Sequence, residues 1–340
     1  MSKNSIDCND ISFVVQGSIF DKLTTAKVLD SIRFNYPTSK IILSTWHGSD
    51  YSKLDYDKII LSKDISLYYR FYKDIDLINN INRQIVSTIN GLKKVKTKYV
   101  VKIRTDIFLT NNNIINLLKN IKKNPKSNLL NSKIILPYDL SINPNNIQLV
   151  FHLNDFFIAG MTSDLIKLFD IPLMSKNDLS FFETSKNYQE KGAVDYSVYT
   201  FRNFFKNKIK VEYLKKNMIS RFAPEQYIYK FIMLKNNAED FNHGFIFNDN
   251  LRNIHNAFVK KNILFESSKK IGFLNLKYKL GFFTDREGHY TNFQIFPPKN
   301  FLFKFDYQHF LFKIIKFFKL IILKISINLF NFLKDIEHNK

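Results

Sequence analysis

Short β-prone runs alternate with longer amphipathic stretches over the first 140 residues, and this alternation constrains the fold most strongly. The runs are rich in Ile, Val and Leu, and apolar residues in the stretches between them recur at helical spacing. The expected strands are 11–17, 40–46, 58–62, 99–103 and 133–137, and the expected helices are 24–35, 79–92 and 112–121. Repeated strand–helix–strand units are typical of parallel sheets. The sequence therefore predicts an α/β fold with a mainly parallel central sheet flanked by helices.

Polar residues at the ends of the expected strands are the first candidates for a site, because ligands of open α/β sheets bind beyond the carboxyl ends of the strands. The strands lead into Gln16-Gly17, Thr45-Trp46, Asp64 and Arg104-Thr105-Asp106. The sequence contains no Gly-x-Gly-x-x-Gly pattern and no Walker-type loop. Dinucleotide-dependent oxidoreductases and P-loop NTPases therefore lack their usual sequence evidence here.

The end of the strand at 99–103 is unusual, because Arg104 and Asp106 follow an otherwise apolar run. A carboxylate at this place suits a hard divalent cation such as Mg²⁺ or Mn²⁺, which prefers oxygen ligands. Arg104 would then pair with Asp106 or contact a phosphate directly. The structural alternative is a capping Asp106 that forms a salt bridge with Arg104.

The chain carries a net charge of +21, from 51 basic and 30 acidic side chains, and only eight of the basic residues are arginine. Such an excess favours an anionic partner, either phosphates, an acidic membrane surface or nucleic acid. The alternative is that lysine simply fills a solvated surface. Proteins that read bases rely on arginine, so we expect no specific nucleic-acid recognition; charge-driven, nonspecific binding is a third functional hypothesis.

Cysteine usage and the N-terminus indicate a cytoplasmic protein. Cys8 is the only cysteine, so an intramolecular disulfide and a cysteine-based zinc site are both excluded, as suits a reducing compartment. The first residues contain no apolar segment typical of a signal peptide. We find no uncharged apolar window of about 18 residues that would predict a transmembrane helix.

Residues 301–334 differ from the rest of the chain in composition. On a helical wheel their lysines share one side with the other polar residues, and the opposite side is almost wholly Phe, Ile and Leu. A helix of this kind suits the interface of an anionic membrane. The alternative is a helix packed on the protein's own core or on another subunit. We expect residues 1–298 to form the main domain and residues 299–340 to form a basic amphipathic tail.

Several sequence blocks resemble the WavE lipopolysaccharide-synthesis family. The longest block is NNINRQIVSTINGLKKVKTKYVVKIRTDIFLT (79–110), in which Asn-Arg-Gln-x-x-Ser-Thr is the most specific part. The other blocks are FVVQGSI (13–19), KIILSTWHGSD (40–50), LDYDKIILSKD (54–64), HLNDFFIAG (152–160), RFAPEQY (221–227) and, more weakly, HYTNFQIF (289–296). Together they cover most of residues 11–296.

The resemblance implies a GT-A-like (Rossmann-like) glycosyltransferase at the cytoplasmic side of the inner membrane, associated with it peripherally. Its donor would be a nucleotide sugar, and its acceptor a lipid-linked lipopolysaccharide, lipooligosaccharide or capsule precursor. The donor half would cover about 1–140 and the acceptor half about 141–298. The alternative, from another class, is a non-catalytic membrane-bound scaffold with a degenerate transferase fold, because Arg104 replaces the first acid of the usual Asp-x-Asp motif.

The resemblance also implies roles for individual residues on the donor side. Gln16 and Gly17 would accept the nucleotide, Asp64 its base or ribose, and Arg83 and Arg104 the phosphates. Asn82 and Gln84 would bind donor hydroxyls, and Asp106 would ligate Mn²⁺ or Mg²⁺. An equally acceptable interpretation of the neighbouring Asn79 and Asn80 is that they cap the helix.

Two carboxylates are candidates for the base of an inverting transfer, which has to deprotonate the acceptor hydroxyl. Asp155 is the first choice, and Glu225 is the second. The alternative for Glu225 is an acid favoured by the helix dipole, because Pro224 would begin a helix there. His152 and His243 are weaker candidates for additional metal ligands, and Trp46 would stack on a base or pack in the core.

Overall fold

The computed structural model describes residues 6–19, 21–70, 76–121, 129–145, 149–175, 222–234, 241 and 248–276 of the chain. Contacts divide the chain into two units, Met1–Ile295 and Phe296–Lys340, and every described residue belongs to the first. The expected tail helix (301–334), the weak block at 289–296 and His243 lie outside the described residues. The boundary expected at residue 298, between the main domain and the tail, stays a prediction. No helix in the described ranges is long and apolar enough to cross a membrane.

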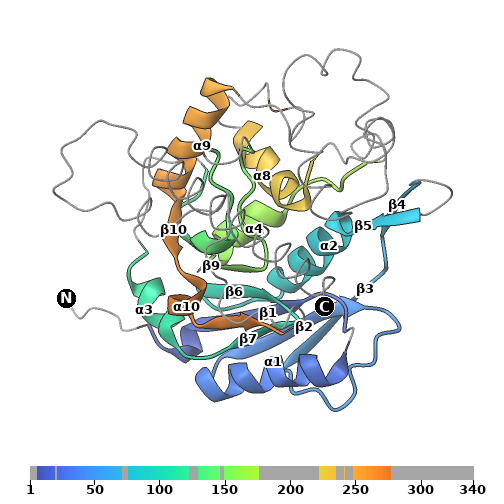
Figure 1. Ribbon diagram of the computed structural model, residues 1–340. Helices are drawn as coiled ribbons and strands as arrows, with labels where there is room; N and C mark the ends of the chain where they lie inside the picture. Colours follow the sequence, from blue (N-terminus) through green and yellow to red (C-terminus); the bar gives the residue numbers. More distant parts are fainter. Residues whose placement is uncertain are drawn as a thin grey trace, which may run out of the picture. The chain divides into compact units, whose positions relative to one another are not determined.

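A seven-stranded sheet forms the centre of the described fold (Figure 1). In spatial order its strands are β10 (Ile263–Glu266), β8 (Ile134–Pro137), β9 (Phe157–Met161), β6 (Tyr99–Arg104), β1 (Ile11–Gln16), β2 (Lys40–Trp46) and β3 (Lys58–Ser62). The strands from β6 to β3 are parallel, and β10 is parallel to β8. Only β9 runs against its two neighbours. The mainly parallel α/β sheet predicted from the sequence is confirmed.

The strand β1 lies in the middle of the parallel part, and all six of its side chains are buried. Its side chains alternate between two hydrophobic clusters: Val14 joins Val100 on one face, and Phe13 joins Val101 on the other. A strand buried on both faces requires a nearly continuous apolar run, as in parallel sheets generally. This is why the strand at 11–17 can be recognised from the sequence.

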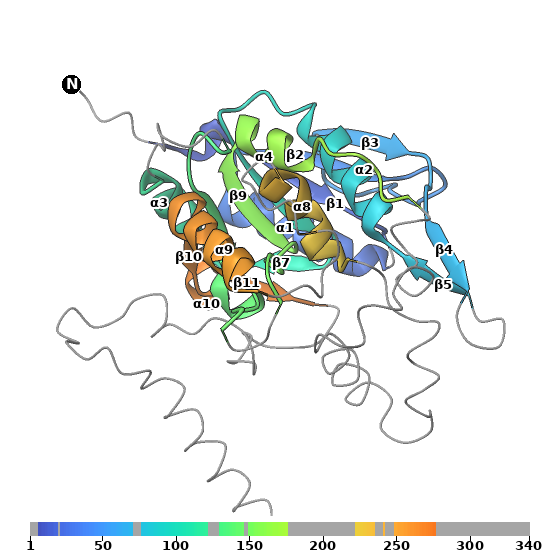
Figure 2. The same cartoon turned by 90° about the horizontal axis from the view of Figure 1, so that it is seen from above.

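Helices cover both faces of the sheet (Figures 1 and 2). One face packs against α1 (Lys22–Asn35), α3 (Asn113–Lys119) and the short α10 (Ser268–Ile271). The other face packs against α2 (Ile81–Leu92), α4 (Thr162–Phe169), α8 (Pro224–Leu234) and α9 (Asp249–Asn262). The helix α1 begins earlier than predicted, because the Asp21 carboxylate accepts hydrogen bonds from the main-chain N–H groups of Leu23 and Thr24 at 3.0 and 3.2 Å.

Two small antiparallel ribbons accompany the main sheet: β4 (Leu67–Arg70) with β5 (Asp76–Asn79), and β7 (Ile107–Leu109) with β11 (Phe273–Asn275). The first was not predicted. It shifts the start of α2 from Asn79 to Ile81, and the Asn79 side chain accepts a hydrogen bond from the Ile81 N–H at 2.9 Å. The second continues at Leu276, whose N–H donates to the Asp106 carbonyl at 2.9 Å. It therefore fixes the turn that follows β6.

The helix α2 approaches the sheet closely at Gly91. A Cβ atom at this position would lie 2.6 Å from Val14 Cγ1 and 3.3 Å from Ser44 Cβ. Glycine lowers the intrinsic stability of a helix by about 1 kcal/mol relative to alanine. The absence of a side chain at residue 91 nevertheless lets α2 sit directly on β1 and β2.

We predict that Gly91→Ala destabilises the protein by about 1–3 kcal/mol, because overpacking outweighs the gain in helix propensity. Urea unfolding followed by circular dichroism measures the difference. Asp30→Ala, at an exposed position of α1, is the control and should change stability by no more than about 0.5 kcal/mol. A Gly91→Ala protein as stable as the wild type would contradict the close approach of α2.

Candidate functional site

The site begins where β1 and β6 end side by side. From β1 the sheet continues on one side to β2 and on the other to β6, and ligands of α/β sheets bind at such a switch point. Gln16 and Arg104 are partners in the strand register, and the Thr105 N–H donates to the Gln16 carbonyl at 3.2 Å. Two of the residues expected from the sequence are therefore neighbours at the carboxyl edge.

Gly17 turns the chain away from the sheet with a φ of +122°, which side chains other than glycine rarely adopt. Its N–H donates to the Ser44 carbonyl at 3.0 Å. The preceding Gln16 is buried, and its Oε1 accepts a hydrogen bond from Ser87 Oγ of α2 at 2.7 Å. The first strand end is thus fixed by both its conformation and its hydrogen bonds, and nucleotide binding by these two residues stays a prediction.

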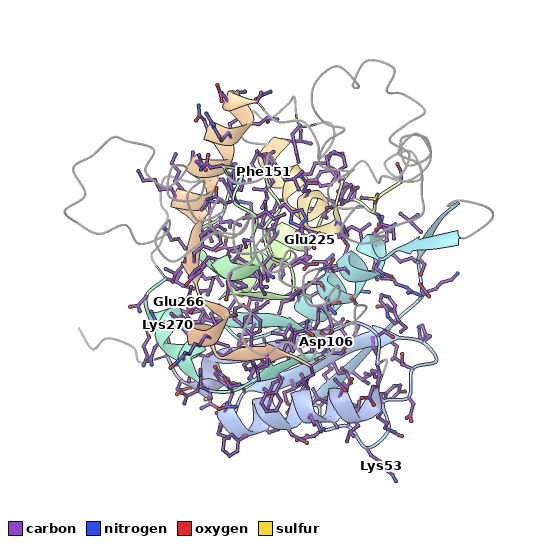
Figure 3. All side chains as sticks on the ribbon, in the orientation of Figure 1. Lys53, Asp106, Phe151, Glu225, Glu266 and Lys270 are labelled. Carbon is purple, nitrogen blue, oxygen red and sulfur yellow. The ribbon has the colours of Figure 1, made fainter. Side chains whose placement is uncertain are left out.

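Arg104 and Asp106 form a two-point ion pair. Arg104 Nε donates to Asp106 Oδ1 at 3.0 Å, and Nη2 donates to Oδ2 at 2.5 Å. The guanidinium carbon also lies 4.5 Å from the centre of the Phe156 ring. The side chains of Arg104 and Asp106 are 22% and 11% exposed. The salt bridge considered as the structural alternative is present, and it holds both groups at the sheet edge (Figure 3, where Asp106 is labelled).

The resemblance implies a divalent cation at Asp106, and the donor atoms available there limit how it would bind. No group of three His, Cys, Asp or Glu side chains suited to a metal occurs in the described part of the chain. Both oxygens of Asp106 are occupied by Arg104. Mg²⁺ characteristically takes one or two carboxylates and completes its shell with water and phosphate. Asp106 therefore fits a cation that a bound diphosphate would hold, once Arg104 releases one oxygen.

Asp64 and Arg83 form a second ion pair at the edge, beyond the ends of β2 and β3. Arg83 Nε donates to Asp64 Oδ1 at 2.8 Å, and Nη2 donates to Oδ2. The Arg83 hydrogen bonds, aided by those from Ser66, hold the pKa of Asp64 well below its ordinary value. Trp46 lies next to the pair, with its ring centre 5.9 Å from the guanidinium carbon. Three residues expected near the donor therefore lie together.

Asn82, which precedes Arg83, points into the core. Its Nδ2 donates to the Met174 carbonyl at 3.0 Å, and its Oδ1 accepts from the Met174 N–H at 2.7 Å. The side chain is buried and joins α2 to the chain that follows α4. This contact explains why an amide is needed at residue 82, and donor binding by Asn82 stays a prediction.

Gln84, the third residue of the Asn-Arg-Gln block, connects α2 to Asp155. Its Nε2 donates to Asp155 Oδ2. Asp155 is only 6% exposed, and its other oxygen, Oδ1, is buried with no hydrogen-bond partner among the described residues. A buried acceptor without a partner is uncommon and costly. Oδ1 is therefore the best-defined position for a ligand hydroxyl group.

Glu225 lies in the first turn of α8, which begins at Pro224 (Figure 3), and interacts electrostatically with Asp155. Burial, followed by the negative charge of Asp155, raises the pKa of Glu225 to about 8. His152 Nε2 lies 3.7 Å from Glu225 Oε2, and burial lowers the pKa of His152 to about 4. At neutral pH this is therefore a contact between an uncharged imidazole and a protonated carboxyl group.

The structure adds Lys102, which lies within the largely apolar run expected to form the strand at 99–103. Its side chain is completely buried, and Nζ donates to the main-chain carbonyl of Asp155. Burial, together with the positive charge of Arg104, lowers the pKa of Lys102 to about 8, although the negative charge of Asp155 opposes this shift. The alternation of side chains along a strand could have indicated this residue, because Lys102 lies two residues before Arg104 and therefore shares its face.

Comparison with models of known protein families shows to which family this chain belongs. The model of the family described as "WavE lipopolysaccharide synthesis" matches residues 11–294. The chain belongs to the WavE family. The match includes every candidate site residue from Gln16 to Glu225 and ends before the expected tail.

Other comparisons add little to the WavE assignment. No curated protein matches the sequence. Among solved structures, a cytidylyltransferase from Leptospira borgpetersenii serovar Hardjo-bovis (strain JB197) is similar with 10% sequence identity and a TM-score of 0.31. The similarity covers 70% of this WavE chain and 99% of the cytidylyltransferase chain.

We predict that Glu225→Gln removes a pH dependence of stability from this WavE protein. The pKa of Glu225 is about 8 in the folded state against an ordinary value of 4.5, so the folded state holds a proton that the unfolded state has lost between these values. The wild type should therefore lose stability relative to Glu225→Gln as the pH rises from about 4.5 to about 8. Urea unfolding of both proteins across this range measures the effect, and parallel curves would contradict a protonated Glu225.

Proposed function

We propose that this WavE-family chain is a nucleotide-sugar-dependent glycosyltransferase with a GT-A-like fold, acting in lipopolysaccharide, lipooligosaccharide or capsule synthesis. The observation that carries the proposal is the buried Oδ1 of Asp155, which has no hydrogen-bond partner among the described residues and lies at a sheet edge that also holds two arginines. A base that deprotonates an acceptor hydroxyl needs such an oxygen, and a diphosphate leaving group needs positive charge beside it. Family membership supports the link to lipopolysaccharide.

The donor would bind across the ends of β1, β2 and β6. Arg83 and Arg104 offer planar guanidinium groups, which bind phosphate oxygens at two points. Each forms an ion pair with an aspartate, Asp64 or Asp106, and would exchange hydrogen bonds to the carboxylate for hydrogen bonds to phosphate on binding. Gly17 has no side chain to keep the nucleotide away from the main chain.

The transfer would be a single displacement. Asp155 Oδ1 accepts the proton of the acceptor hydroxyl as its oxygen forms a bond to the anomeric carbon. The bond between that carbon and the donor phosphate oxygen breaks, and the nucleoside diphosphate leaves with the electron pair, so that configuration is inverted. Glu225, uncharged at neutral pH, would orient the acceptor by a hydrogen bond. Mn²⁺ or Mg²⁺ held by Asp106 and the diphosphate would neutralise charge on the leaving group.

The second candidate, a non-catalytic scaffold of polysaccharide assembly, is favoured by one observation. Arg104 replaces the first acid of the usual motif and engages both oxygens of the only acid that remains there. A scaffold with a degenerate site has no need to release Asp106 and should not bind nucleoside diphosphates. Calorimetric titration with nucleoside diphosphates, with and without Mn²⁺, separates the two hypotheses.

We predict that Asp155→Asn lowers the rate of sugar transfer by about 100- to 10,000-fold and leaves nucleoside diphosphate affinity unchanged, because only the base is lost. Asp106→Asn should instead weaken binding of the diphosphate in the presence of Mn²⁺. Transfer from a panel of nucleotide sugars to lipid-linked acceptors, together with calorimetry, measures both effects.

The matched control is Asp170→Asn, which removes an exposed carboxylate paired with Lys93 outside the site and should change neither property. Wild-type transfer by both Asp155→Asn and Asp106→Asn would show that the site is assigned wrongly. Failure of the wild type to bind any nucleoside diphosphate would favour the scaffold.

We also propose that residues 301–334 hold the enzyme on the anionic surface of the inner membrane, where lipid-linked acceptors are found. Each lysine near such a surface contributes about 1 kcal/mol to the free energy of membrane binding. Replacing Lys313, Lys316 and Lys319 with Gln should therefore lower the affinity for phosphatidylglycerol vesicles roughly 100-fold. Co-sedimentation measures this, with phosphatidylcholine vesicles for comparison.

The control for this prediction removes the same charge from exposed lysines of the main unit, Lys58, Lys119 and Lys269. Its affinity for vesicles should stay within a few-fold of the wild type. An equal loss in both triple variants would show that net charge, and not the tail, causes binding.

A further inference from the structure

The strand β6 directs two cationic side chains to one face. Side chains alternate along a strand, so Lys102 and Arg104 point to the face that also carries Val100 and packs against α2, α4 and α8. Lys102 lies opposite Val14 of β1 and Ile158 of β9 in the register. An apolar residue would fill this place at no electrostatic cost, whereas a buried ammonium group is expensive unless it is compensated.

The surroundings of Lys102 supply that compensation. Its Nζ donates to the Asp155 carbonyl and lies 5.6 Å from the centre of the Phe169 ring of α4. The charged groups that face it are Arg104 in β6, Asp106 in the turn after β6, Asp155 before β9 and Glu225 in α8. Asp155 in turn faces His152 and the Tyr229 hydroxyl, whose pKa burial raises well above its ordinary value. Lys102 is thus the buried cation nearest the main chain of the expected base.

Two carboxyl groups that interact in a partly buried site cannot both ionise freely. Burial and the charge of Asp155 raise the pKa of Glu225, whereas the positive charges of Arg104 and Lys102 lower it. Arg104 has its own partner in Asp106. Lys102 forms its hydrogen bond with a neutral carbonyl, so its charge is available to the pair of carboxyl groups.

We propose that Lys102 is a positioning residue of this site: its ammonium group anchors the main chain at Asp155 and supplies the buried positive charge that keeps one carboxylate ionised in the Asp155–Glu225 pair. The role in turnover rests on the function proposed above, while the role in carboxyl ionisation does not. Lys102 acts through Asp155 and touches neither donor nor acceptor. A lysine, and not an apolar residue, is therefore needed at the centre of β6.

The first test is Lys102→Met, which keeps the length of the side chain and removes its charge. The acid limb of the pH profile of turnover should move to higher pH by about one pH unit, and the KM for the nucleotide sugar should stay within about twofold. Lys98→Met, an exposed lysine just before β6, is the matched control and should leave the profile unchanged. A Lys102→Met profile that coincides with that of the wild type would overturn the proposal.

The second test needs no turnover. Infrared difference spectra of the ligand-free protein follow the protonated carboxyl band of Glu225, which Glu225→Gln identifies by its loss. In Lys102→Met this band should titrate at higher pH than in the wild type, because the pKa of Glu225 is no longer lowered by the ammonium group. An unchanged titration would refute the charge role, even in a protein that transfers no sugar.

Folding is checked by circular dichroism, with Lys102→Gln as a second neutral variant. We expect at least one of the two variants to fold, since Met keeps the length of the buried side chain and Gln keeps a hydrogen-bond donor for the Asp155 carbonyl. Loss of folding in both would assign Lys102 to the fold alone and overturn the proposal. Absence of nucleotide binding in the wild type, with the Glu225 titration shifted as expected, would reject the transferase and retain the charge role.

Discussion

The parallel pairing of β1 with β6 is the constraint on which the rest of the described structure depends. It places Gln16 beside Arg104 and leaves the carboxyl ends of both strands at one edge. Because both strands are buried, helices have to cover both faces, and the connections between strands and helices become the places where polar residues can gather. The site is therefore a consequence of how a buried parallel sheet has to end.

The three acids near this edge, Asp106, Glu225 and Asp155, each interact with different neighbouring groups. Asp106 is paired with an arginine at two points, and the raised pKa of Glu225 favours its protonated form. Asp155 lies close to a lysine, and one of its oxygens has no hydrogen-bond partner in the described part of the chain. Three carboxyl groups in one region thus acquire three different chemical characters from their surroundings. Such a division favours a reaction in which a phosphate is held at one place and a proton is moved at another.

Local patterns in the sequence were sufficient for the strands β1, β2, β3, β6 and β8 and the helices α1, α2 and α3, because a buried strand requires an uninterrupted apolar run. They did not reveal the β4–β5 ribbon or the antiparallel direction of β9, which depends on pairing with a distant segment. The partner of Asn82 is a main-chain group 92 residues away. The other residues of the site could be predicted from their positions at strand ends and from the sequence blocks that resemble the WavE family. Lys102 could not be, because the residues around it in the strand are apolar.

The missing side chain at Gly91 has a consequence for how the site can change. The helix α2 carries Arg83 and Gln84 at one end, and its distance from the sheet is set at the other end, where only a hydrogen atom fits against Val14. Adding a methyl group at residue 91 would tilt or lift the helix and so change both contacts at once. In directed evolution, a larger residue at position 91 should be accepted only together with a smaller residue at position 14. The pair would then change activity in a way that neither substitution does alone.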